Sequence, residues 1–117
     1  MVRPSRRGRL TGAGAFETIF RAGRRSEGEF LQLLSLPAAR SCGRVGFVIG
    51  KKALPRAVDR NRVRRMLRVV LREARPAIGG LDVIVRVKRG APRTAFPRFV
   101  VEASRLLATL AAEQRAP

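Results

Sequence analysis

Two neighbouring segments, RVGFVIGKK (residues 44–52) and AVDRNRVRRMLRVVLREAR (residues 57–75), decide the fold of this chain. In the first segment, large apolar residues alternate with smaller ones, which predicts a β-strand over Arg44–Lys51. The large residues share one face of that strand, and they are Val45, Phe47 and Ile49. The opposite face is expected to be shallow, open to another backbone or an extended ligand, because it carries Gly46, Val48 and Gly50.

The second segment predicts an amphipathic helix from about Arg60 to Ala74, with Asp59 as its N-cap. Pro76 and the Gly79-Gly80 pair are expected to end it. Its apolar residues recur at helical spacing and form the predicted buried stripe, which consists of Val63, Met66, Leu67, Val70, Leu71 and Ala74. At about 100° per residue, a polar group clusters on the opposite side, namely Asn61, Arg64, Arg65, Arg68, Arg72 and Arg75.

The residues before these segments predict a short helix and one further strand. The helix is expected from Thr11, which can cap it, to about Ala22, and Phe16 and Phe20 share one of its faces. Three further segments follow, which predict a loop at Arg24–Glu29, a strand at Phe30–Leu36 ended by Pro37, and a turn at Ala38–Gly43.

The residues after the long helix predict a strand at Asp82–Lys88 and a last helix from about Thr94. Val83, Val85 and Val87 are expected to face inward from the strand. The inner stripe of the last helix is predicted to be Val100, Ala103, Leu107, Leu110 and Ala111. The order of helix, strands, helix, strand and helix indicates the α+β class, with one sheet and helices packed on it.

The composition points to a polyanionic partner. The 117 residues suffice for one domain, and they carry 26 Lys and Arg against 8 Asp and Glu, a formal net charge of +18. All but three of these basic residues are arginine, whose planar guanidinium binds phosphates bidentately and stacks on bases. Nucleic acid is therefore the expected partner.

The charge is concentrated in residues 51–75, which hold ten basic and two acidic residues. Arg64, Arg68 and Arg72 follow one another at four-residue steps, and such like-charged pairs destabilise an isolated helix by about 0.2–0.5 kcal/mol each. Bound phosphates would remove that repulsion. The alternative interpretation is an ordinary solvated face that keeps the protein soluble.

Several functions are excluded or disfavoured by what the chain lacks. Without histidine it has no Ser-His-Asp triad, no Cys-His nucleophile pair and no His-ligated metal. Its single cysteine, Cys42, cannot form an internal disulfide, which favours a cytoplasmic setting. The carboxylates are too few and scattered to suggest a two-metal nuclease, and no apolar run approaches the ~20 residues of a membrane span.

The two deciding segments closely resemble the signature of the bacterial ribonuclease P protein family, in which a strand ending in two basic residues is followed by a loop and then by Arg-Asn-Arg in a basic helix. Here these features are Lys51-Lys52 and Arg60-Asn61-Arg62, with Arg64, Arg65 and Arg68 beyond. The flanks resemble the family as well, in Arg9-Leu10 before Phe16 and Phe20 and in the stretch Gly80–Val85. The resemblance covers about residues 9–112.

The resemblance implies a single compact domain with the order α-β-β-β-α-β-α and a left-handed crossover between parallel strands, against the usual hand. It implies a flexible basic arm at residues 1–10, the RNA-binding domain at 11–112 and a tail at 113–117. It also implies a protein subunit, expected to be monomeric and bound one-to-one to a catalytic RNA, that assists removal of the 5′ leader from precursor tRNA. The catalytic Mg²⁺ ions are expected to be held by the RNA and the substrate. The protein is expected to hold no metal and to supply no catalytic residue.

The resemblance also implies two groups of site residues. The expected RNA-binding residues are Lys51, Lys52, Arg60, Asn61, Arg62, Arg64, Arg65, Arg68 and Arg72. A cleft for the single-stranded leader is expected at Phe16, Phe20 and Val48. Many relatives line this cleft with an aromatic residue of the first strand, where this chain offers only Leu31, Leu33 and Leu34.

Three alternatives remain open. On composition alone the two phenylalanines of the first helix are better read as core residues, a preference that the resemblance reverses. Asn61 could equally bond a phosphate or fix the neighbouring loop. A structural ribosomal protein is the alternative function, since such proteins are also small and basic, although they typically spread their charge over tails and extended loops.

Overall fold

The computed structural model describes residues 13–38 and 43–115. Its elements are α1 (Ala13–Ala22), β1 (Arg24–Glu27), β2 (Leu31–Pro37), β3 (Val45–Ile49), α2 (Ala57–Ile78), β4 (Leu81–Val87), the 3-10 turn η2 (Arg93–Ala95) and α3 (Phe96–Arg115). The predicted cap Thr11, the basic arm, Cys42 and most of the predicted turn lie outside the described residues. Helix α3 continues to Arg115, past the predicted domain end at residue 112.

Strands β2 and β4 form the centre of the sheet because they carry apolar residues on both faces. Leu31 to Leu34 and Leu81 to Val85 are buried without interruption. The strand order is β1-β2-β4-β3, with β1 antiparallel to β2, β2 antiparallel to β4, and β3 parallel to β4. The predicted α+β class and order of elements are confirmed. The hand of the β3-α2-β4 crossover stays a prediction.

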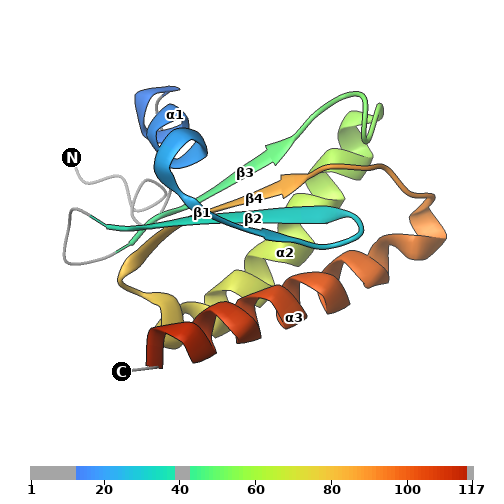
Figure 1. Cartoon of the computed structure of the whole chain (residues 1–117). Helices are drawn as coiled ribbons and strands as arrows, with labels where there is room; N and C mark the ends of the chain where they lie inside the picture. Colours follow the sequence, from blue (N-terminus) through green and yellow to red (C-terminus); the bar gives the residue numbers. More distant parts are fainter. Residues whose placement is uncertain (1–12, 39–42, 116–117) are drawn as a thin grey trace, which may run out of the picture.

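Two layers of helix cover the sheet unequally (Figure 1). Helices α2 and α3 lie along one face, where Val63, Leu67 and Leu71 of α2 and Phe99 and Leu107 of α3 belong to the main core cluster. The short helix α1 lies on the other face. It is anchored by Ile19, which packs with Leu34 and Ile84 in a second buried cluster.

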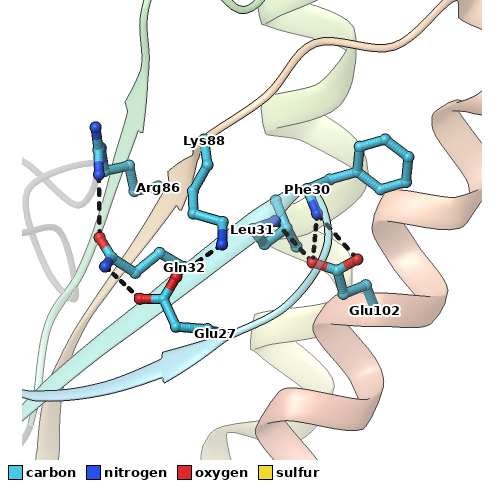
Figure 2. A network of polar contacts seen from close by, with 7 residues as sticks. All are labelled: Glu27, Phe30, Leu31, Gln32, Arg86, Lys88 and Glu102. Atoms are coloured by element: carbon cyan, nitrogen blue, oxygen red, sulfur yellow. Dashed lines mark hydrogen bonds and ion pairs between the residues drawn. The ribbon is translucent and has the colours of Figure 1, made fainter.

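A buried carboxylate fastens the β1–β2 hairpin to α3 (Figure 2). Glu102 accepts hydrogen bonds from the backbone N–H of Phe30 at 2.9 Å and of Leu31 at 2.7 Å. Gly28 lies so close to this carboxylate that a Cβ atom there would overlap it. The start of β2 is therefore held in place by a residue of the last helix.

The sequence-based prediction of a loop at Arg24–Glu29 is wrong for its first four residues. They form the edge strand β1, in which Arg24 pairs with Ser35 and Glu27 with Gln32. The segment shows no apolar alternation, because an exposed edge strand is held by backbone hydrogen bonds to its neighbour rather than by burial.

The prediction for the long helix is wrong at its start and partly right at its end, where Gly79 is the C-cap as expected. Helix α2 begins at Ala57 with Arg56 as the N-cap, so Asp59 lies inside its first turn, where a carboxylate is favoured by the helix dipole. At the other end, Pro76 is accommodated within the helix, which continues to the buried Ile78. Burial of Ile78 offsets the hydrogen bond that proline cannot donate.

The predicted inner stripe of α3 is confirmed at Ala103, Leu107, Leu110 and Ala111, which are buried. Val100, predicted to belong to it, is only half-buried. Three residues that were not predicted complete the buried apolar face: Phe96, Phe99 and Leu106. In β4 the three inward valines are confirmed, but Ile84 is buried as well because α1 covers the other face.

Candidate nucleic-acid interface

The outward side of α2 carries the predicted basic residues. The apolar stripe of this helix packs on the sheet and turns five arginines away from it: Arg62, Arg64, Arg65, Arg68 and Arg72. All are exposed except Arg64, which is half-buried. The structure therefore brings these predicted residues together on one helix surface.

The part of this surface nearest β3 is ordered by contacts. The Arg68 guanidinium lies over the ring of Phe47, 5.8 Å from its centroid. One turn earlier, Arg64 donates a 2.8 Å hydrogen bond to the side-chain oxygen of Asn61. Asn61 thus orients an arginine, a role that the sequence does not indicate. We call this group, Asn61, Arg64 and Arg68 with Phe47 beside them, the α2–β3 surface.

The acidic residues compensate arginines elsewhere. Ion pairs join Arg24 to Glu113, Arg44 to Asp82, Lys88 to Glu27, Arg93 to Asp59, and both Arg89 and Arg98 to Glu29. Within residues 13–38 and 43–115, by contrast, Arg62, Arg64, Arg65 and Arg72 form no ion pair with a carboxylate. Their positive charge is therefore not neutralised by a carboxylate of the described residues.

Arg60 differs from its neighbours on α2. It is half-buried, and its guanidinium donates to the carbonyl oxygens of Leu54 and Pro55 at 2.9 and 2.8 Å. These bonds fix the loop that follows β3, whose Leu54 is buried in the core. Lys51 and Lys52 are exposed on the same loop. Arg60 thus supports the loop that presents the two lysines.

The start of α2 does not place the Arg-Asn-Arg motif at free helix N–H groups. The motif begins three residues after the first helical residue, Ala57. The first turn instead contains the carboxylate of Asp59, which pairs with Arg93 at 2.9 Å. The positive end of the helix dipole is already opposed by this charge, so the motif presents side chains rather than free backbone N–H groups.

The predicted leader cleft residues Phe16, Phe20 and Val48 come together on the other face of the sheet. All three are half-buried and pack against the cluster of Ile19, Leu34 and Ile84. Of the three leucines named above, all of which lie in β2, Leu34 lies on this face, whereas Leu31 and Leu33 belong to the main core. Gly46 is buried, so the shallow face predicted for β3 is open only from Val48 onward.

A polar row that the sequence does not indicate crosses the sheet beside Val48 (Figure 2). In the strand register Glu27 pairs with Gln32, Gln32 with Arg86, and Arg86 with Val48. The Gln32 amide donates to Glu27, and Gln32 accepts a 3.2 Å hydrogen bond from Arg86. Lys88 donates to Glu27 at 2.7 Å. These hydrogen bonds, first that of Lys88 and then that of Gln32, lower the pKa of the Glu27 carboxyl from its ordinary value.

The described part of the chain offers no cluster of three or more His, Cys, Asp or Glu side chains that could hold a metal ion. Nor does any helix within it have the length and apolar character needed to cross a membrane.

Comparisons with known proteins identify the family and agree with the fold. A family model described as Ribonuclease P matches residues 5–111. The ribonuclease P protein component of Chromohalobacter salexigens is 41% identical over 86 residues, covering 73% of this chain and 67% of its own. That of Chromobacterium violaceum is 32% identical over 103 residues, covering 88% and 85%.

Solved structures show the same fold. A mutant RNase P protein from Staphylococcus aureus superposes with a TM-score of 0.76 at 19% identity, over 91% of this chain and 90% of its own. The RNase P protein from Thermotoga maritima superposes with a TM-score of 0.69 at 24% identity, over 89% and 96%. With the matched segment spanning nearly all of its residues, the chain belongs to the ribonuclease P protein family.

Proposed function

We propose that this chain, as the protein subunit of ribonuclease P, uses two separate surfaces in the 5′ maturation of tRNA. The outward arginines of α2, including the α2–β3 surface, would bind the catalytic RNA. The cleft between α1 and the sheet would hold the 5′ leader of precursor tRNA. The observation that carries the proposal is the charge of Arg62, Arg64, Arg65 and Arg72, which form no ion pair with a carboxylate of the described residues. This charge is set apart from the half-buried aromatic residues of α1.

The α2 surface suits the RNA backbone. Each guanidinium can donate two parallel hydrogen bonds to one phosphate. Asn61 restrains Arg64, and the ring of Phe47 restrains Arg68, so less side-chain freedom is lost when RNA binds. Phosphates would also relieve the repulsion between arginines four residues apart.

The α1 cleft suits a single strand. Phe16 and Phe20 keep part of each ring exposed, while Ile19 between them fixes the helix to the sheet. Exposed aromatic rings stack on unpaired bases with little regard to sequence, and each stacked base contributes about 1–3 kcal/mol. Such a cleft would distinguish precursor tRNA from mature tRNA, which has no leader.

The chemistry is assigned to the RNA. Among the described residues no group of side chains could hold a metal ion, and we propose no cleavage step that uses an ion bound by the protein. Mg²⁺ held by the RNA and substrate would supply charge stabilisation and activate the attacking water. The protein contributes binding and orientation, as one monomer per RNA in the cytoplasm.

Reconstitution tests this proposal. The full-length protein, freed of RNA, is added to a bacterial ribonuclease P RNA at low magnesium concentration, and cleavage of precursor tRNA is measured. We expect the RNA and protein together to cleave, and each alone to be inactive under these conditions. Metal-dependent cleavage by the RNA-free protein would overturn the assignment of chemistry to the RNA.

The same preparation distinguishes the ribosomal alternative. We expect RNA that co-purifies with the protein from a bacterial host to be one species of a few hundred nucleotides together with tRNA precursors. Co-sedimentation with ribosomal subunits, without stimulation of precursor cleavage, would support a structural ribosomal role instead.

A further inference from the structure

Arg86 lies on the open part of the sheet, beyond the cover of α1. The row Leu34, Ile84 and Gly46 is buried beneath α1. Arg86 belongs to the next row on the same face, about 7 Å further along the strands. It is exposed, and its register partner on β3 is the cleft residue Val48.

The contacts of Arg86 restrain the side chain without cancelling its charge. Its guanidinium donates one 3.2 Å hydrogen bond to the Gln32 side chain. Gln32 is neutral and 6% exposed, and it is held in turn by Glu27. The negative charge of Glu27 is paired with Lys88, and among the described residues no carboxylate forms an ion pair with Arg86.

A guanidinium has five N–H donors, and only one is used in this contact. The end of the side chain beyond that bond points away from Gln32 and Glu27 (Figure 2). A buried amide thus holds an exposed arginine in a fixed orientation, next to the residues that we assign to the leader. This arrangement fits a phosphodiester group better than a base edge, because the free donors form a planar positive fork.

We propose that Arg86 binds a phosphodiester of the 5′ leader and that Gln32 is its positioning residue. The inference rests on the proposed function, since it requires the leader to lie on this face of the sheet. It adds to the aromatic cleft an electrostatic contact for a longer leader.

The test uses the reconstituted holoenzyme and precursor tRNAs whose leaders increase in length one nucleotide at a time, with mature tRNA as the leaderless probe. We expect Arg86→Gln to weaken binding about tenfold once the leader passes a threshold length, and to leave shorter leaders and mature tRNA unaffected. The slope of log affinity against log salt should fall by about 0.7 for long leaders. The matched control is Arg105→Gln, at an exposed arginine of α3 on the other side of the sheet. It should change neither the affinity for long leaders nor the salt slope.

A double-mutant cycle tests the role of Gln32. We expect Gln32→Leu to reproduce the loss in the wild-type background and to add nothing to Arg86→Gln. If Gln32→Leu weakened binding equally in the wild type and in Arg86→Gln, Gln32 would have a structural role. That result would overturn its role in positioning Arg86. Normal long-leader binding by Arg86→Gln, or an equal loss for mature tRNA, would overturn the phosphate contact. If the wild-type holoenzyme itself showed no preference for leader-bearing tRNA, the proposed leader cleft would fail, and this inference with it.

Discussion

Alanine substitutions in α1 should separate its core residue from its RNA-binding residues. Ile19 is 2% exposed and packs against Leu34 and Ile84, which are fully buried. Truncating an isoleucine in such a site costs about 2–5 kcal/mol. For a domain of this size, a loss of about 3 kcal/mol lowers the melting temperature by roughly 12 °C. We therefore expect Ile19→Ala to weaken the binding of precursor and mature tRNA to the same extent, because less of the protein is folded.

Phe20→Ala should behave differently, because the ring is only half-buried. It is less buried than a core phenylalanine, whose truncation costs about 3–5 kcal/mol, so we expect a smaller loss of stability. The lost stacking on one base should weaken precursor binding by about 1–3 kcal/mol, which is roughly 5- to 150-fold. Binding of mature tRNA should stay nearly constant, and Phe16→Ala should follow the same pattern.

Thermal melts and paired affinities for precursor and mature tRNA, measured on the same preparations, decide between these patterns. If Phe20→Ala lowers the melting temperature as far as Ile19→Ala does, and the precursor-to-mature affinity ratio does not change, then Phe20 is a core residue. The leader would then bind elsewhere, and the argument from its exposure would be refuted.

Three further predictions concern other parts of the molecule. Arg64→Glu combined with Arg68→Glu should leave the circular dichroism spectrum unchanged but weaken binding to the catalytic RNA, with a salt slope reduced by about 0.7–0.9 per lost phosphate contact; an unchanged slope would mark an ordinary solvated surface. Glu102→Ala should lower the free energy of unfolding by about 2–5 kcal/mol because it leaves two buried backbone N–H groups without an acceptor, and Glu102→Gln should lose less in the same urea titration. The lowered pKa of Glu27 means that its carboxylate adds stability above its unfolded-state pKa of about 4.3, and that this stability is lost as pH falls through the lower folded-state pKa. The difference in melting temperature between wild type and Glu27→Gln should therefore shrink on acidification, and a difference that grew would contradict this sign.

The parts of the fold that could be predicted are those with a local pattern. The alternation in β3 and β4 and the apolar stripe of α2 need no knowledge of their partners. Edge strand β1 could not be predicted, because its four residues are defined by pairing with β2. The prediction of Asp59 as a cap fails for a similar reason, since its partner is Arg93, 34 residues further along the chain.

The candidate site divides in the same way. The arginines of α2 follow from helical spacing, and the shared face of Phe16 and Phe20 follows from their separation of four residues. The row from Glu27 through Gln32 to Arg86 depends on the register between three strands. Two of its members, Gln32 and Arg86, are 54 residues apart in the chain. No local pattern reports that register. Arg86 is exposed where Ile84 is buried, which marks the end of the surface covered by α1.

The strand order has a consequence for solubility. Strands β1 and β3 form the two edges of the sheet, and an uncovered edge invites pairing with another chain. Edge β1 carries Arg24 and Arg25, and edge β3 lies beside Arg68 of α2. Two copies that approach edge to edge therefore meet like charges, and this repulsion weakens as salt rises. The protein without RNA should be most prone to self-association at high ionic strength, where this repulsion no longer keeps its copies apart.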